Sequence, residues 1–423
     1  MGSPSSVDTP PSAASESWMR RLARTTPGVI GIIALAVAAI CVIAGVVCGG
    51  QLDGRIDERN AVLTSSEPFA YAAQNLYAAL SAADAAAASA FLSGGIETAE
   101  MRAKYQRALA DAASALADTT AGTTDPATRT SLADISAGLS AYTALIESAR
   151  ANNRQGFVIG SAYLREASTL MQTSLLPGAE KIFTANLATV DKDQRAVGSL
   201  PIASLVLLTL ALVAIGVASM IMYGRTNRQF NIGLVIAAAT VVLVIGWVVV
   251  ATQLAAGEIE HSRAEGTARF EQLAKARINA QQARTVETLE LIARGDITAR
   301  EKSFHGHIDE LGKLLDAAPA ATKDAVQNWS ASHQKQTDAY NGGDYEAAVA
   351  QAIGPDPAAS ATQFAAVESS LRDGIERTRE TLRDRVAAAG AWLAWSPTGT
   401  LVLMVVAASA AIVGLWPRLK EFL

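Results

Sequence analysis

Four long apolar stretches, none of which contains a charged residue, divide the chain of 423 residues into two large polar blocks. A helix needs about 20 residues to cross the hydrocarbon core of a bilayer, and each stretch reaches that length. The sequence therefore predicts an all-α membrane protein with four transmembrane helices. We expect these helices at 27–49, 198–224, 231–253 and 396–417.

The basic residues that lie outside the two polar blocks gather in short segments beside the apolar stretches. They are Arg20, Arg21, Arg24, Arg225, Arg228, Arg418 and Lys420. Because short basic segments stay on the cytoplasmic side of a membrane, we expect the tail 1–26, the link 225–230 and the tail 418–423 in the cytosol. The blocks 50–197 and 254–395 then lie outside the plasma membrane. The first tail is rich in Ser and Pro, and we expect it to be disordered.

The two polar blocks match each other at a shift of about 200 residues, which indicates an internal duplication. The clearest match places Gly95, Thr98 and Ala99 on Gly295, Thr298 and Ala299. Alanine is abundant in both blocks and only 5% of all residues are aromatic, a composition that favours helix over sheet. We therefore expect two duplicated extracytoplasmic four-helix-bundle domains.

Turn signals in the first block separate four helices. A first helix over about 51–93 is expected to end at a glycine pair, Thr98 to cap the second helix, and Pro126 to open the third. The fourth helix is expected to begin near 157 and to bend at Pro177. The first and fourth helices should continue into the membrane spans.

An up-down-up-down arrangement places the first and third turns of each bundle together at one tip. We expect these turns to form the docking surface for a protein partner. In the first block they contain Gly94, Gly95, Asn152, Asn153 and Gly156. In the second block they contain Gly295, Asp296, Asn341, Gly342, Gly343 and Asp344.

The sequence contains no pattern that indicates catalysis, so we expect a protein that is not an enzyme and has no cofactor. There is no phosphate-binding glycine loop and no nucleophile motif. The four histidines, His261, His305, His307 and His333, are too scattered to predict a metal site. A transporter is disfavoured because the apolar stretches carry no charge, and no nucleic-acid partner is expected. The small residues Gly45 and Gly49 allow either a homodimer contact or simple helix packing.

Four basic side chains on the predicted bundle helices are candidate ligands for an amino-acid carboxylate. They are Arg165, Lys275, Arg277 and Arg284. Such an arginine more often pairs with a neighbouring glutamate, and Trp329 is expected to be a core residue. A protein partner at the turns needs no such pocket, and we favour that interpretation.

The stretch from Gly160 to Gln172, GSAYLREASTLMQ, leads to Leu175-Leu176-Pro177 and resembles the GlnX-type family of actinobacterial membrane proteins. The resemblance extends to the whole arrangement of spans and blocks. It implies an amino-acid-binding lipoprotein (GlnH) as the partner outside, with aspartate or glutamate as the type of ligand. It also implies a Ser/Thr kinase (PknG) as the partner inside, so that the chain relays a signal that controls glutamate metabolism.

Two other functions fit the sequence. One is a direct small-molecule sensor that binds its ligand within the helical bundles. The other is a structural scaffold of the cell envelope. The cytosolic segments are too short for a kinase or cyclase domain, so any output has to pass to a separate protein in the cytosol.

Overall fold

The computed structural model describes residues 26–94, 97–226, 231–316 and 318–420. These residues form helices and no strand, which confirms the all-α prediction. The chain divides into two compact units. Unit 1 consists of Met1–Glu58, Val197–Gly257 and Ala388–Leu423, and unit 2 consists of Arg59–Ala196 and Glu258–Ala387.

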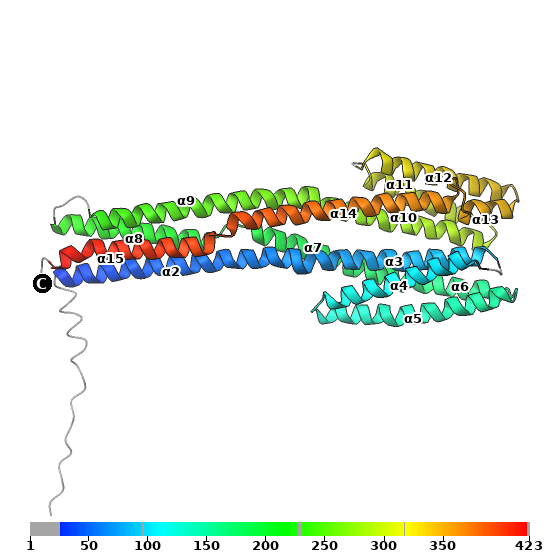
Figure 1. Cartoon of the computed structure of the whole chain (residues 1–423), viewed down its shortest axis with the longest axis horizontal. Coiled ribbons are helices and arrows are strands. Elements are labelled where there is room, and N and C mark those ends of the chain that lie inside the picture. The colour runs from blue at the N-terminus through cyan, green and yellow to red at the C-terminus, as the bar shows by residue number, and fades with distance from the viewer. Residues whose placement is uncertain (1–25, 95–96, 227–230, 317, 421–423) are drawn as a thin grey trace, which may run out of the picture. The chain divides into compact units, whose positions relative to one another are not determined.

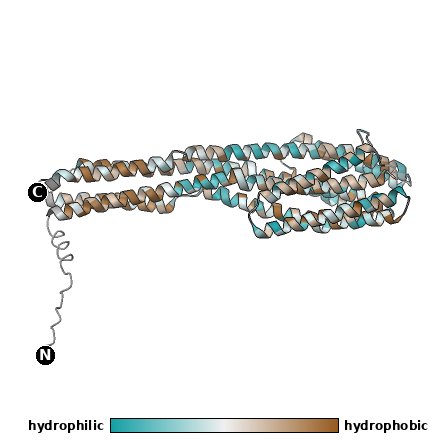
Figure 2. Ribbon diagram, turned by 60° about the horizontal axis from the view of Figure 1, so that its bottom comes forward, coloured by the Kyte–Doolittle hydropathy of each residue, from teal (hydrophilic) through white to brown (hydrophobic). Residues whose placement is uncertain are grey.

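Unit 1 contains the four helices that are long and apolar enough to cross a membrane, as predicted for a multi-pass membrane protein. These helices are α2 (Thr26–Ala61), α8 (Ile202–Thr226), α9 (Ile232–His261) and α15 (Ser396–Lys420). Figure 2 shows hydrophobic residues dominating them, whereas the helices of unit 2 are mixed. Large apolar side chains on their outer faces are exposed, as contact with lipid requires, and Leu35 and Met220 are examples.

The small-residue face of α2 packs within the chain. A Cβ atom added at Gly45 would lie 2.7 Å from the Cβ atom of Met404, and one added at Gly49 would lie 3.4 Å from the carbonyl oxygen of Pro397. Both neighbours belong to α15. The glycines that could have served a homodimer contact therefore let α2 approach α15 closely.

Unit 2 contains both repeats, and each begins with a short π-helical segment. The first repeat consists of η1 (Val62–Ser66), α3 (Glu67–Leu92), α4 (Ala99–Ala121), α5 (Pro126–Arg154), α6 (Ile159–Leu170), η2 (Met171–Leu175) and α7 (Leu176–Gly198). The second consists of η3 (Ser262–Thr267), α10 (Ala268–Ala293), α11 (Thr298–Leu314), α12 (Ala320–Asn341), α13 (Tyr345–Ile353) and α14 (Ser360–Leu393). The matching order of elements agrees with a duplication.

Local chemistry explains the helix starts that were predicted. The Oγ1 atom of Thr98 accepts a hydrogen bond of 3.2 Å from the backbone N–H of Met101 and caps α4. Asp125 accepts a bond of 2.8 Å from the N–H of Thr128, and Pro126 follows it as the first residue of α5. These caps fix the beginnings of the second and third helices of the first repeat.

The prediction that the first and fourth helices continue into the spans was only partly right. The first helix does continue from α2 into α3, but through the π-helical segment η1, and Pro68 follows that segment. In the fourth helix, η2 lies directly before Pro177, where a bend was predicted. A proline cannot donate the backbone hydrogen bond that an α-helix needs, so the turn before it rearranges.

The fourth helices do not run into the spans. α7 ends at Gly198 and α8 begins at Ile202, while α14 ends at Leu393 and α15 begins at Ser396. Pro201 and Pro397 lie at these junctions. Proline lacks the N–H that would continue the preceding helix and is well suited to begin the next one.

The two repeats pack against each other within unit 2, and one hydrophobic core contains residues of both. α3 and α10 lie side by side, and Figure 1 shows α4 and α5 on one side of this pair and α11 and α12 on the other. The rings of Phe183 in α7 and Phe270 in α10 meet edge to face with their centroids 6.1 Å apart. Polar contacts also join the repeats, because the carboxylate of Glu67 in α3 binds Arg379 at 2.6 Å and Arg383 at 2.8 Å in α14.

Candidate functional site

The two turns at the tip of the first repeat lie together. The side-chain amide of Asn153 donates hydrogen bonds to the carbonyl oxygens of Phe91, at 3.3 Å, and Gly94, at 3.5 Å. The turns need the left-handed backbone conformation at Gly94 (φ 89°) and Gly156 (φ 72°). Asn152 donates to Ser148 O of its own helix at 2.8 Å, and Gly95 lies outside the described residues.

An exposed apolar patch follows directly after this turn. Phe157 is 56% exposed, Val158 88%, Ile159 54% and Tyr163 36%. Among the described residues of unit 2, these four are the only exposed large hydrophobic side chains. We call them the apolar turn. An apolar patch left in water is typical of a protein interaction site.

The corresponding tip of the second repeat is polar and closed by its own hydrogen bonds. The backbone N–H of Gly295 donates to the hydroxyl of Tyr340 at 2.7 Å, and that hydroxyl donates to Gly295 O at 3.0 Å. Asp296 accepts a hydrogen bond from the backbone N–H of Thr298, and Asp344 accepts one from the backbone N–H of Ala347, both at 2.9 Å. Asn341, Gly342 and Gly343 are exposed and contribute no apolar side chain. The two tips therefore differ in chemistry although they match in position.

The four candidate carboxylate ligands divide into two exposed and two buried residues. Arg165 and Lys275 lie on the surface, and Lys275 pairs with Glu271 of its own helix at 2.6 Å. Arg277 is buried, and its Nε atom donates to Glu368 in α14 at 2.7 Å. Arg284 is also buried, beside Glu287. The buried pair thus makes the arginine–glutamate contacts that the sequence left open as the alternative.

A cavity of about 1030 Å³ lies between the two repeats of unit 2. One wall is the alanine-rich face of α3 together with part of α4, which contributes Lys104. The opposite wall is formed by α10 and α14 and contains Arg277, Arg284 and Glu368. The cavity has room for a small polar ligand and presents both signs of charge to it.

Each repeat also contains a buried polar cluster between its first and third helices. In the first repeat, Asp84 accepts hydrogen bonds from Tyr142 at 3.2 Å, Ser168 at 2.9 Å and Gln172 at 3.2 Å. Burial raises the pKa of Asp84 although these three donors oppose the shift. The cluster ties α3 to α5, α6 and η2.

In the second repeat, the cluster is built around His333 of α12. Its Nδ1 atom lies 3.1 Å from Glu287 Oε1, and its Nε2 atom lies 2.9 Å from Glu301 Oε1. Burial would lower the pKa of His333, but the bonds to both glutamates outweigh it and raise the pKa to about 9. Burial likewise opposes the ionisation of Glu287, but Arg284 and His333 bring its pKa to about 2.

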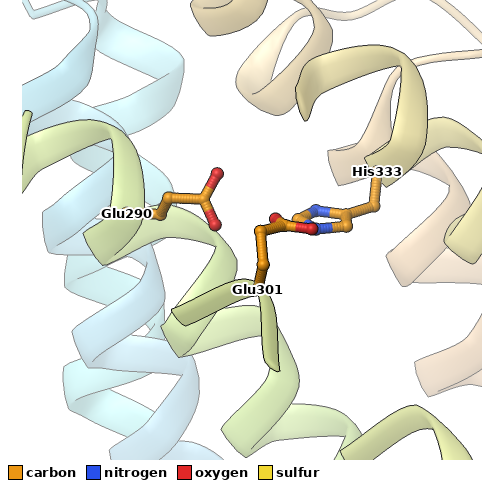
Figure 3. A group of neighbouring side chains, drawn as sticks. All are labelled: Glu290, Glu301 and His333. Carbon is orange, nitrogen blue, oxygen red and sulfur yellow. The ribbon is translucent and has the colours of Figure 1, made fainter. Parts of the chain in front are cut away.

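Glu290 completes this cluster from α10, one turn after Glu287. Figure 3 shows its carboxylate directed toward Glu301 and His333, and one ligand atom from each of the three lies within 4.8 Å of the others. Burial and the neighbouring Glu301 raise the pKa of Glu290 well above its usual range. The sequence interpretation missed this group because it counted histidines alone, whereas two of the three residues are glutamates.

Three of the basic residues that flank the spans lie within described helices. Arg225 lies in α8, and Arg418 and Lys420 lie in α15. Arg20, Arg21, Arg24 and Arg228 lie outside the described residues. The orientation drawn from these residues stays a prediction.

One model of a known family matches the first repeat. Residues 58–195 match the actinobacterial sensor domain. This match supports an actinobacterial protein of the sensor type, and it ends before α8. No curated protein and no solved structure gives a significant match to the chain.

Proposed function

We propose that this protein is a transmembrane signal relay without enzymatic activity, in which unit 2 lies outside the plasma membrane and receives a protein partner at the apolar turn. The partner is an amino-acid-binding lipoprotein that carries aspartate or a glutamate-type ligand. The signal passes through the four spans to a cytosolic Ser/Thr kinase that controls glutamate metabolism. The match of residues 58–195 to a sensor domain supports the sensing role.

The observation that carries the docking proposal is the apolar turn itself. Val158 is 88% exposed at the tip of a domain whose other large apolar side chains, among the described residues, are covered. Aromatic residues such as Phe157 and Tyr163 are enriched where protein interfaces gain most of their binding free energy. The turn is also held in place by Asn153, so little conformational entropy is lost when a partner binds.

The resemblance of Gly160–Gln172 to the GlnX-type family supports the choice of partner. Tyr163 of the apolar turn lies within this same stretch. The basic segments beside the spans support the orientation, because they favour the cytosolic side.

Site-specific photo-crosslinking in native membranes tests the proposal. A benzophenone amino acid replaces Val158 in one variant and Asn341, at the polar tip of the second repeat, in the matched control. We expect the probe at 158 to capture the lipoprotein and the probe at 341 to capture much less of it. Equal capture at both positions, or capture of no binding protein at 158, contradicts docking at the apolar turn.

The cavity between the repeats favours a second candidate function, the direct sensing of a small molecule. Its volume of about 1030 Å³ and its charged wall suit an amino acid with both a carboxylate and an ammonium group. Calorimetry of the purified protein with free aspartate or glutamate separates the two functions. The relay predicts no heat of binding without the lipoprotein, whereas direct sensing predicts saturable binding that Lys104→Met, on the wall of the cavity, weakens.

A further inference from the structure

His333 is arranged as a metal ligand in the second repeat. Its Nδ1 atom faces Glu287 Oε1 at 3.1 Å, and Glu287 is fully buried and also held by Arg284. A carboxylate in this position holds a proton on Nδ1, so a metal ion has only to displace the proton that Nε2 shares with Glu301. Histidines that bind metals in proteins are commonly oriented by a carboxylate in this way. The ring is further fixed by Phe304, which stacks on it with ring centroids 3.6 Å apart.

Glu290 provides a second and independent observation. Its side chain is 0% exposed, and among the described residues neither carboxylate oxygen accepts a hydrogen bond from a basic or neutral donor, so its hydrogen-bond neighbour is the acidic Glu301. Figure 3 shows the carboxylate directed toward Glu301 and His333. A buried carboxylate without donors is costly, and a cation bound between the three side chains removes that cost.

We infer that Glu290, Glu301 and His333 bind a divalent transition-metal ion of the Zn²⁺ class. One imidazole nitrogen and two carboxylate oxygens are a donor set that Zn²⁺ accepts readily, with a fourth position left for water or another ligand. The three ligand atoms already lie within 4.8 Å of one another. Atoms bound to one Zn²⁺ lie roughly 3.3 Å apart, so small side-chain movements close the group around the ion.

The surroundings of Glu301 give the ion a route from solvent. The side chain of Glu301 is 18% exposed, and that of His305, one turn later on α11, is 53% exposed. His305 Nε2 lies 3.5 Å from Glu301 Oε2, which places a further imidazole at the mouth of the site. Glu290, Glu301 and His333 belong to α10, α11 and α12. The ion therefore joins three helices of the second repeat.

The first repeat does not share this donor set. Its corresponding cluster holds Asp84 and Tyr142, and both are already bonded to each other. Metal binding is therefore a property of the second repeat, which lies outside the matched sensor domain, and it adds to the relay without depending on it.

Isothermal titration of ZnCl₂ into the full-length protein, purified in detergent and treated with a chelator, tests the inference. We expect the parent protein to bind one Zn²⁺ and Glu290→Gln to weaken that affinity at least tenfold. Gln has nearly the shape of Glu, and its amide can donate to Glu301 as a protonated Glu290 does, so this variant should keep its fold, which its circular dichroism verifies. The matched control is His307→Gln, on the same helix α11, which should bind as the parent does.

Two results overturn the inference. One is a parent protein that binds no Zn²⁺, in which case the cluster holds a proton instead. The other is an affinity that Glu290→Gln leaves unchanged, which places the bound ion elsewhere. Neither result bears on docking at the apolar turn, which is tested by crosslinking.

Discussion

Replacing Arg277 by methionine should destabilise unit 2 strongly, because the change leaves a carboxylate without its main partner. Arg277 is 5% exposed and donates from Nε to Glu368 at 2.7 Å and from Nη1 to Gln74 at 3.1 Å. Gln74 belongs to the first repeat and is fully buried. Removing one partner of a buried ion pair costs about 3–5 kcal/mol, and the lost bond to Gln74 adds about 1 kcal/mol.

A second substitution should restore most of this stability. In the double variant Arg277→Met/Glu368→Met the unpaired carboxylate is gone, so we expect a cost of only about 1 kcal/mol relative to the parent. Arg372→Met is the matched control, since Arg372 approaches the same Glu368 at 3.4 Å but is 60% exposed. A surface pair of this kind contributes less than about 1 kcal/mol.

Thermal unfolding of the purified full-length proteins, followed by circular dichroism, measures these differences. The expected order of melting temperature is parent, Arg372→Met, double variant and then Arg277→Met. A loss of melting temperature in Arg277→Met no larger than that in Arg372→Met would contradict a buried ion pair between Arg277 and Glu368. In that case Arg277 is free to serve as the carboxylate ligand that the sequence first indicated.

Three further changes test other parts of the structure. Gly266→Ala should lower the free energy of unfolding by about 2 kcal/mol, because the added Cβ would lie 2.9 Å from the backbone Cα of Leu382. At Gly306 nothing lies within 4 Å, so Gly306→Ala should raise the free energy of unfolding by about 1 kcal/mol through helix propensity. Equal melting temperatures of the two variants would contradict this. Burial raises the folded-state pKa of Asp84 above its unfolded value, so the contribution of Asp84 to stability falls as pH rises above about 4. The melting temperature of Asp84→Asn should therefore improve relative to the parent between pH 4 and pH 7. A difference in melting temperature that stays constant over this range would contradict the raised pKa. Asn153→Ala should lower the free energy of unfolding by about 1 kcal/mol and speed hydrogen exchange at the tip of the first repeat. Unchanged exchange there would contradict the conclusion that Asn153 holds the two turns together.

The parts of the fold that depend on local chemistry were predictable from the sequence. The uncharged stretches give the spans, Thr98 caps α4, and Pro126 opens α5. The turns of the first repeat follow from Gly94 and Gly156, whose positive φ angles suit glycine. Each of these features is set by a few neighbouring residues, so a single sequence contains the information.

The contacts that join distant segments were not predictable in this way. Glu67 pairs with Arg379, 312 positions along the chain, and no local pattern indicates such a partner. The candidate metal site combines residues from three helices, and only the packing of α10, α11 and α12 brings Glu290 and His333 together. At the π-helical segment η3, Ser262 likewise accepts a hydrogen bond of 3.0 Å from Gln194 of the first repeat, 68 positions earlier in the chain.

The apolar turn lies between these two cases. The sequence predicted the turn and proposed it as a docking surface, but it selected the polar residues Asn152 to Gly156. The structure places the exposed apolar side chains just after them, at Phe157, Val158 and Ile159. The helix that begins at Ile159 needs only its inner face for the core, so Val158 and its neighbours are left in water.

The most direct test of the proposed relay measures Ser/Thr kinase signalling in intact cells whose only copy of this protein carries Val158→Asp. External aspartate or glutamate is added, and the phosphorylation of the kinase's substrates is measured beside the parent and the matched variant Asn341→Asp. We expect Val158→Asp to abolish the response while the protein still reaches the membrane, and Asn341→Asp to respond as the parent does. A full response from Val158→Asp would contradict docking at the apolar turn.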